Sequence, residues 1–286
     1  MTQQLQIDHS TVWLAPAKLN LFLRVLNRRP DGMHDLQTVF QLLDFGDQMS
    51  FALSESGEIE RDYDFVPFDV DLCVRAVRAL EQQTQKRLAV KISLNKYLPM
   101  GGGVGGGSSD AAITLIAVNH LWRLGLSKFD LMKIGLKLGA DVPVFVNGQS
   151  VWAEGIGERF TAIDLPEENY LVVTPNVSVS TAEIFTNKCL TRDQDAITIR
   201  DFHEGRARNE LESIVRESYS LVDDTFKWLE QYGNPVMTGT GASVFLRLNS
   251  REKACQIAEE CPEFATAFIA RGIQQHPYYD GVWPSG

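Results

Sequence analysis

The sequence predicts an α+β fold built as two domains, and three observations support this. Stretches in which apolar and polar residues alternate, as in half-buried strands, are interspersed with stretches of helical periodicity along the whole chain. Glycine clusters at 101–107 and 238–243 fall one in each half. A turn signal, Gly155-Ile156-Gly157, separates the halves, and 286 residues suffice for two cores. We therefore expect an N-terminal domain over 1–155 and a C-terminal domain over 156–286.

Composition describes a globular protein and excludes several functional classes. Hydrophobic residues make up 44% of the chain and charged residues 22%, as in ordinary soluble domains. The net charge of −10 argues against a nucleic-acid partner, because such binding relies on a basic surface. The apolar runs are too short to cross a bilayer, the N-terminus has no apolar signal core, and the four cysteines lack metal-ligand spacing. We therefore expect a cytoplasmic protein without nucleic-acid or membrane partners.

The first predicted strand, over residues 12–26, places two polar side chains next to each other. Its alternation directs an apolar set, from Ala15 to Leu23, toward the core. Lys18 and Asn20 then share the opposite face. That face is either an ordinary solvated strand surface or part of a polar site.

A turn signal follows this strand. Pro30-Asp31-Gly32 precedes Met33 and His34, so both side chains are expected near the end of the Lys18 strand. A single histidine in a loop is more often an incidental surface residue, and its role stays open on these grounds.

Further elements of the first half follow from the same periodicities. Alternation predicts strands over 38–43, 49–53 and 88–94, and helical spacing predicts a helix over 71–80. Lys96 comes just before the first glycine cluster, where a lysine either meets a nucleotide or stays solvated.

The segment Pro99–Asp110 is the feature around which the other elements are arranged. Six of the seven residues from Gly101 to Gly107 are glycine, and a helix that is apolar nearly all round follows, with Ser108 or Ser109 as its expected N-cap. Bare N–H groups that lead into a helix N-terminus bind anions, so we predict a phosphate site here. The alternative is a flexible Gly/Ser linker, which would not normally run directly into a strong helix.

Three common nucleotide motifs do not account for this loop. A P-loop needs a lysine before its Ser/Thr, whereas Gly107 is followed directly by Ser108. A dinucleotide-binding fingerprint can be forced onto 101–106, but it lies outside an opening βαβ unit. No acidic residue stands out as the one that would bind the ribose of the nucleotide. The protein-kinase motifs are absent.

The elements after the loop are predicted from caps and periodicity. Ser127 to Asp130 has the pattern of a capping box, and Gly139 is expected to end that helix. Asp141 then precedes the apolar run 142–146, where an acid needs a partner or a function, or caps a helix. Strands are expected over 170–174, 244–248 and 265–272, helices over 211–232 and 251–260, loops over 190–210, and no regular structure from Gln274 onward.

Several of these segments together resemble one superfamily of kinases. Pro16–Leu21, Pro99–Ala112 and Thr238–Ala242 are similar to the three motifs of the galactokinase, homoserine kinase, mevalonate kinase and phosphomevalonate kinase (GHMP kinase) superfamily. Within it the chain is most similar to the 4-diphosphocytidyl-2-C-methyl-D-erythritol kinases, over about Val12 to Gly272. The segments that carry this similarity are Pro16–Asn20, Asp31–His34, Leu98–Ser109 and Gly139–Phe145, in that order.

This resemblance implies a two-domain GHMP-kinase fold with the active site in the cleft between the domains. It implies an enzyme that transfers the γ-phosphate of ATP to the 2-hydroxyl of 4-diphosphocytidyl-2-C-methyl-D-erythritol, in the non-mevalonate route to isoprenoid precursors. On the family pattern Asp141 is the base that takes the proton from this hydroxyl, and Lys18 stabilises the charge on Asp141 and orients the hydroxyl.

The family pattern assigns the ATP phosphates to the glycine loop, and Mg²⁺ is expected with ATP. Ser108 is the candidate magnesium ligand by analogy with relatives. The ATP-binding residues implied by the resemblance are Pro99, Met100, Gly101, Gly102, Gly103, Val104, Gly105, Gly106, Gly107, Ser108 and Ser109.

The same pattern assigns the acceptor to five residues: Asn20, Met33, His34, Thr181 and Phe185. His34 would read the edge of the cytosine, and Phe185 would stack on the ring. The family often has tyrosine where this chain has Met33, whose thioether can still pack against an aromatic ring.

Two alternatives remain at this point. One is a kinase of the same superfamily whose acceptor is homoserine or a mevalonate derivative, against which Asp31–His34 argues because those acceptors carry no base. The other is a nucleotide-binding regulator without turnover.

Overall fold

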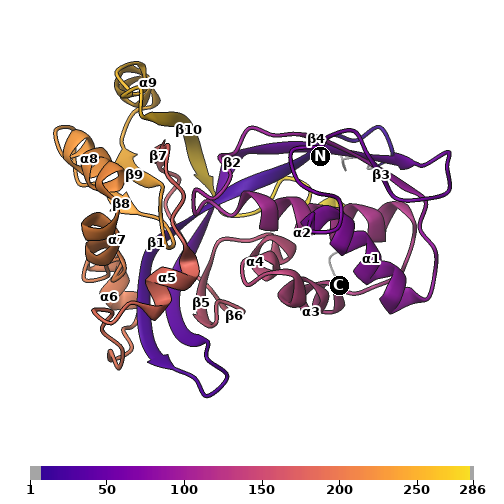
Figure 1. Cartoon of the computed structure of the whole chain (residues 1–286), viewed down its shortest axis with the longest axis horizontal. Coiled ribbons are helices and arrows are strands. Elements are labelled where there is room, and N and C mark those ends of the chain that lie inside the picture. The colour runs from indigo at the N-terminus through magenta and orange to yellow at the C-terminus, as the bar shows by residue number, and fades with distance from the viewer. Residues whose placement is uncertain (1–7, 284–286) are drawn as a thin grey trace.

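Two long strands cross the computed structural model, which describes residues 8–283 (Figure 1). β1 (Trp13–Arg28) and β2 (His34–Leu53) form an antiparallel hairpin whose register runs from Trp13 opposite Met49 to Arg28 opposite His34. The prediction of two separate strands over 38–43 and 49–53 was wrong. Gly46 makes no turn between them; a Cβ atom there would lie 2.0 Å from the carbonyl oxygen of Ala15, so the glycine allows β1 and β2 to approach closely.

β2 is the strand that joins the two halves of the sheet. β1 pairs with it along one edge, and β5 (Val151–Gly155), β10 (Ala265–Ile273) and β4 (Val90–Asn95) pair with successive stretches of the other edge. β10 continues the sheet into β7 (Asn169–Pro175), which pairs with β9 (Val244–Leu248). Two short strands complete the N-terminal side and one the C-terminal side: β3 (Glu60–Arg61), β6 (Arg159–Ala162) and β8 (Val236–Met237).

Helices cover each half of this sheet, as Figure 1 shows. The N-terminal half carries α1 (Leu72–Thr84), α2 (Gly106–Leu121), α3 (Lys128–Leu138) and α4 (Val142–Asn147). The C-terminal half carries α5 (Thr181–Thr186), α6 (Ile199–His203), α7 (Glu212–Ser218), α8 (Ser220–Leu229) and α9 (Arg251–Glu259). Within residues 8–283, no helix combines the length and apolar character needed to span a bilayer.

Three helix predictions need correction. The helix expected over 211–232 is two helices, because Tyr219 is extended and its hydroxyl is held by Glu183 of α5. α6 lies in a region expected to be loop. α2 begins at Gly106 with Gly105 as N-cap, so Ser108 and Ser109, the two expected N-caps, both lie inside the helix. The capping box of Ser127 and the end of α3 at Gly139 are confirmed.

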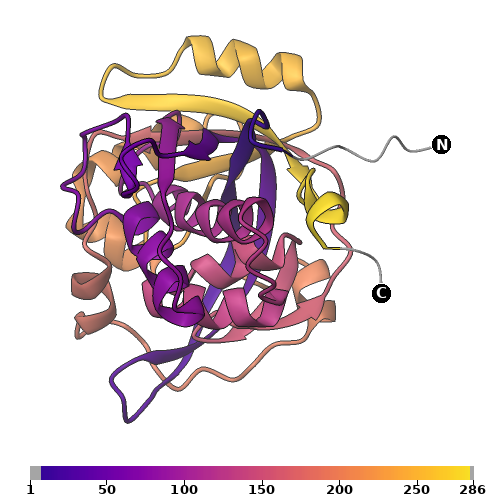
Figure 2. The same ribbon diagram turned by 90° about the vertical axis from the view of Figure 1, so that its right-hand side faces the viewer.

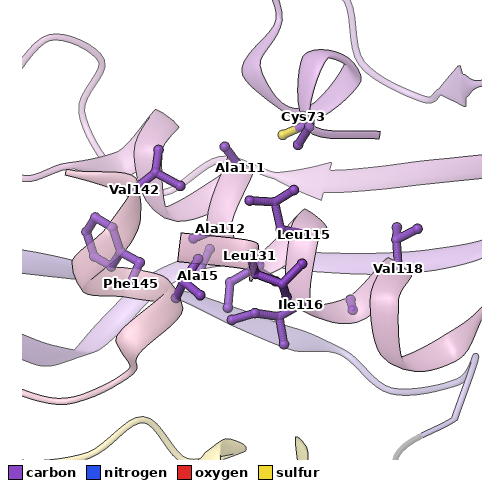
Figure 3. Close-up of a cluster of buried hydrophobic side chains, with 14 of the residues drawn as sticks. Ala15, Cys73, Ala111, Ala112, Leu115, Ile116, Val118, Leu131, Val142 and Phe145 are labelled. Carbon is purple, nitrogen blue, oxygen red and sulfur yellow. The ribbon is translucent and has the colours of Figure 1, made fainter. Parts of the chain in front are cut away.

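α2 is buried on nearly all sides, as its sequence predicts. Figure 3 shows Ala111, Ala112, Leu115 and Ile116 of this helix packed among Cys73 of α1, Leu131 of α3, Val142 and Phe145 of α4 and Ala15 of β1. Neighbours on every side fix the position of α2, and with it the position of the glycine loop that leads into the helix.

The segment after β10 returns to the N-terminal half, where no regular structure was predicted (Figure 2). It contains α10 (Tyr279–Val282), and Val282 joins the N-terminal core. His276 donates its backbone N–H to Gly148 at 2.8 Å, and its Nε2 bonds the carbonyl oxygen of Leu14 at 2.9 Å. Such single contacts leave no periodic pattern in the sequence, so the segment could not be predicted. The domain division at residue 155 stays a prediction.

His276 should make the stability of the protein depend on pH. Burial lowers its pKa from the ordinary 6.5 to about 4, although the bond to Leu14 acts in the opposite direction. Between these values the unfolded chain binds a proton that the folded chain does not, so the free energy of unfolding should fall as the pH drops from 6.5 to 4, by at most about 1.4 kcal/mol per pH unit.

The measurement is urea unfolding at pH 7 and pH 5 for the native protein and His276→Gln. The glutamine can keep the bond to Leu14 but cannot take up a proton, so its stability should fall less between the two pH values. His203→Gln, on exposed α6, is the control. Equal pH dependence in the native protein and His276→Gln would contradict the assignment.

Candidate active site

A cleft of about 450 Å³ opens above the glycine loop. Its floor is the loop and the first turn of α2, and the 238–243 loop and the start of α5 border it on the side of the C-terminal half. The side chains and glycines that line it include Tyr63, Phe65, Val70, Leu94, Lys96, Met100, Gly101, Gly102, Gly103, Gly105, Gly106, Gly107, Ser108, Asp110, Asp141, Thr181 and Thr240. This is a concave site at the junction of the two halves, where ligands commonly bind.

The glycine loop is held by contacts that exclude side chains. A Cβ atom on Gly103 would lie 2.6 Å from the carbonyl oxygen of Gly241, and one on Gly105 would lie 2.7 Å from the ring of Phe145. Both glycines have positive φ. Ser243 donates its N–H to the carbonyl oxygen of Gly102 at 3.1 Å. The two glycine clusters of the sequence therefore pack directly on each other, and the loop is rigid instead of a linker.

Gly105→Ala tests this packing. The new methyl group would press on Phe145 and lie 3.1 Å from Cγ of Lys18, at a backbone φ of +79° that alanine rarely adopts. The positive φ alone should lower the free energy of unfolding by about 1 kcal/mol. We also expect ATP affinity and kcat to fall about tenfold or more, because the methyl group displaces both the loop and Lys18.

Gly125→Ala is the matched control for this prediction. Gly125 has a φ of +77°, yet no atom lies within 4 Å of its Cβ position. The control should lose similar stability and keep its kinetics. Calorimetric ATP titration and initial rates distinguish the two variants, and normal kinetics in Gly105→Ala would show that the close approach is not needed.

Lys18 and Asp141 form an ion pair next to the glycine loop, with Asp141 in the lining of the cleft. Lys18 Nζ lies 3.2 Å from Oδ2 of Asp141 and donates to Oδ1 of Asn20 at 2.5 Å. Its backbone N–H donates to the carbonyl oxygen of Val104 at 3.0 Å, so β1 is joined to the glycine loop itself. The Asn20 amide in turn donates to Thr38 Oγ1 at 2.9 Å. The solvated-face interpretation of Lys18 was wrong, because the residue is only 2% exposed.

Asp141 is the more accessible partner of the pair. Its side chain is 35% exposed and that of Lys18 is 3% exposed. Asp141 stands at the N-cap position of α4 but makes no capping hydrogen bond. The carboxylate is thus oriented by Lys18 on one side and open to the cleft on the other, an arrangement suited to meeting a ligand hydroxyl.

Lys96 belongs to a buried charge cluster instead of being solvated. Its Nζ lies 2.6 Å from Asp47 and 2.6 Å from Asp110, while Asp47 also accepts the N–H groups of Tyr97 and Leu98. Burial raises the pKa of Asp110 to about 7, against the effect of Lys96. Burial lowers the pKa of Lys96, but the two carboxylates outweigh it and the pKa is raised. This cluster fastens the first turn of α2 to β2, and sequence reasoning missed it.

The apolar wall of the cleft was also missed. Tyr63 and Phe65 stack with ring centroids 4.9 Å apart, beside Val70 and Leu94. A planar apolar wall next to a phosphate-type loop is suited to a nucleotide base. The segment containing the two aromatics has no helical or strand periodicity, and only its alternating aromatics could have signalled it.

The residues assigned to the acceptor fall into two groups. Thr181 lines the main cleft, where its hydroxyl lies 2.9 Å from that of Thr240. His34, at the start of β2, and Phe185, in α5, are not among the residues that line this cleft; they stack on each other, with ring centroids 5.0 Å apart. Burial, and then the charges of Arg192 and Arg28, lower the pKa of His34. Met33 is exposed at the tip of the β1–β2 hairpin.

Some residues of the predicted ATP set do not reach the cleft with their side chains. Val104 is fully buried in the central core, and the hydroxyl of Ser109 is buried without a partner among the described residues. Any contact of Val104 with a nucleotide would have to come from its backbone. The roles of the predicted site residues stay predictions.

Comparison with known proteins places this geometry in a family. The models "GHMP kinases N terminal domain" and "GHMP kinases C terminal" match residues 71–149 and 192–267. The 4-diphosphocytidyl-2-C-methyl-D-erythritol kinase of Azoarcus sp. is 50% identical over 267 residues, covering 93% of this chain and 95% of the relative. That of Alkalilimnicola ehrlichii is 50% identical over 263 residues, covering 91% and 90%.

Solved structures agree with the sequence comparison. A crystal structure of a 4-(cytidine 5′-diphospho)-2C-methyl-D-erythritol kinase superposes with a TM-score of 0.79 at 26% identity, over 92% of this chain and 99% of that one. A mevalonate kinase shares the fold, with a TM-score of 0.69 at 16% identity over 93% of this chain and 100% of that one. These matches confirm the predicted two-domain α+β GHMP-kinase fold. The chain is about 50% identical to its relatives over nearly their full length, and it therefore belongs to the 4-diphosphocytidyl-2-C-methyl-D-erythritol kinase family of the GHMP kinases.

Proposed function

We propose that this protein transfers the γ-phosphate of ATP to the 2-hydroxyl of 4-diphosphocytidyl-2-C-methyl-D-erythritol, as a cytoplasmic step of the non-mevalonate isoprenoid route. The observation that carries the proposal is the ion pair of Lys18 and Asp141, 3.2 Å apart, beside a rigid glycine loop that leads into α2. Both partners of the reaction are small molecules.

ATP would lie in the main cleft, with its phosphates on the glycine loop. The first N–H groups of α2 and the positive end of its dipole favour an anion there, and the loop has no side chains to block it. Lys96, Tyr63 and Phe65 border the same cleft, and the stacked aromatic pair supports a base-binding role for the wall that contains it.

The transfer itself depends on position and charge. The bond between the γ-phosphorus and the oxygen that bridges it to ADP breaks as the acceptor oxygen bonds the γ-phosphorus, and the hydroxyl proton passes to Asp141. Phosphoryl transfer demands little covalent chemistry from the protein, so a base within reach of the hydroxyl and a cation beside the transferring group supply most of what the protein must add. Lys18 would hold Asp141 and neutralise charge on the γ-phosphate.

Magnesium is expected to accompany ATP. Mg²⁺ in nucleotide sites takes one or two protein oxygens and completes its shell with phosphates and water. Within residues 8–283 there is no group of three or more His, Cys, Asp or Glu that could hold a metal alone, whereas the Ser108 hydroxyl borders the cleft at the first turn of α2 and fits a phosphate-bound ion. The ion would neutralise charge on the phosphates, and Ser108 is the residue that would hold it.

The deciding experiment couples ADP release to a spectroscopic readout. With ATP and the cytidine-containing acceptor we expect turnover, and with homoserine or mevalonate none. Turnover of homoserine alone would show that the acceptor belongs to another class of compound. ATP binding without ADP release on any acceptor would favour a regulator.

A further inference from the structure

Arg192, which follows α5, connects the two residues assigned to the cytosine. Its Nε donates to Nε2 of His34 at 3.3 Å, and its NH2 group donates to the carbonyl oxygen of Phe185 at 2.6 Å. The remaining bonds of the guanidinium go to the carbonyl oxygens of Leu190 and Asn187, each at 3.2 Å. One side chain therefore joins the start of β2 to the end of α5.

The bond to His34 also fixes where the imidazole carries its proton. A guanidinium can only donate, so Nε2 must accept, and the neutral ring must carry its hydrogen on Nδ1. Nδ1 has no recorded partner among the described residues. It therefore remains available as a hydrogen-bond donor to a ligand.

We propose that Arg192 is a specificity-determining positioning residue, which holds His34 as an Nδ1–H donor beside Phe185 so that the site prefers cytosine to uracil. The inference rests on the proposed function, in which His34 meets the base edge. Cytosine N3 accepts a hydrogen bond, whereas uracil N3 carries a hydrogen. A fixed donor favours the first and opposes the second, and buried sites that leave a polar group unpaired discriminate strongly.

The electrostatic surroundings favour the same tautomer. The charged groups that face His34 are Arg192, from the segment after α5, and Arg28, opposite it on β1. Burial and these two cations lower the pKa of His34. The ring is thus kept neutral near pH 7, and Nε2 stays free to accept.

The test begins with the intact native protein. Long-range ¹H–¹⁵N spectra of its five histidines, with His34 assigned by a His34→Asn variant, report the tautomer directly. We expect Nδ1 to be protonated at pH 7. A ring protonated on Nε2 would overturn the proposal, and because the tautomer is measured in the native protein, this result does not depend on the folding of any Arg192 variant.

The second measurement compares CDP and UDP binding by calorimetry in the native protein, Arg192→Met and Arg192→Lys. Arg192→Met should weaken CDP binding about 10- to 100-fold and UDP binding less, so that the preference for CDP shrinks. Its kcat for the cytidine acceptor should stay within about threefold, its KM for that acceptor should rise, and its ATP affinity should be unchanged. Lysine keeps the charge but not the planar fork, so it should restore little of the preference.

Arg200→Met is the matched control, since Arg200 is exposed on α6 and, among residues 8–283, its side chain bonds only Glu204. An unchanged CDP-to-UDP preference in Arg192→Met would refute the proposal. A native protein that fails to phosphorylate the cytidine acceptor would instead refute the proposed function, so the two failures are distinguishable. The pKa of His34, followed in the same spectra, should rise in Arg192→Met, which removes a neighbouring cation, and should rise less in Arg192→Lys, which keeps the charge.

Discussion

Replacing Asp141 with asparagine should lower kcat by roughly 10²- to 10⁴-fold, the range that a positioned general base contributes. Asparagine has the same shape and keeps an oxygen near Lys18, but its amide cannot accept the hydroxyl proton. ATP binding should be preserved, because the glycine loop and the start of α2 are untouched. The expected result is therefore a fall in kcat at nearly constant ATP affinity.

Single-turnover rates and calorimetric ATP titration measure this directly. Asp224→Asn, at an exposed carboxylate of α8, is the matched control and should leave both quantities unchanged. Asp141 is 35% exposed, so its replacement should cost little stability and the loss of rate should not reflect unfolding. Near-normal turnover in Asp141→Asn would remove the base assignment.

Lys18→Met should reduce kcat by about 10³-fold, comparable to the lower range for removal of a cation that stabilises phosphoryl transfer. Methionine fills most of the buried channel of the lysine side chain beside Phe40, over whose ring Nζ lies at 5.4 Å. The ammonium that holds Asp141 and Asn20 is lost, while Asp141 can still be solvated from the cleft. The variant should therefore fold normally but transfer the phosphoryl group much more slowly.

The double variant gives the sharper measurement. If Lys18 and Asp141 act as one unit, Lys18→Met/Asp141→Asn should be little slower than the worse single variant, because each single change already disables the pair. Lys227→Met, at an exposed lysine of α8, controls for loss of charge. Strictly multiplicative effects would mean that the two side chains contribute independently, contrary to the mechanism.

The local patterns of the sequence predicted the regular elements well. The alternation of residues 12–26 corresponds to β1, the capping box at Ser127 begins α3, and 244–248 is β9 as expected. These features depend on neighbours in the chain, which a sequence displays. The partnership of Lys18 with Asp141 was implied by family resemblance and not by periodicity, since 123 residues separate them (141 − 18).

What could not be predicted depends on contacts between distant segments. The single strand β2 was predicted as two strands that stop on either side of Gly46, because the close contact of this glycine with Ala15 is invisible in the sequence. The cluster of Lys96, Asp47 and Asp110 joins three separate segments, and Arg192 meets His34 across 158 residues. In each case the residue types are ordinary, and only the fold brings them together.

The return of the last segment to the N-terminal half has a consequence for how the chain is made. Val282 completes a core whose other members emerge from the ribosome much earlier, and His276 joins Leu14 across 262 residues. Domains commonly fold as they are synthesised, N-terminal first. Here the half that carries the glycine loop and Asp141 cannot close its core until residue 282 has emerged, so a nascent chain should acquire its catalytic arrangement only after the C-terminal half has been synthesised.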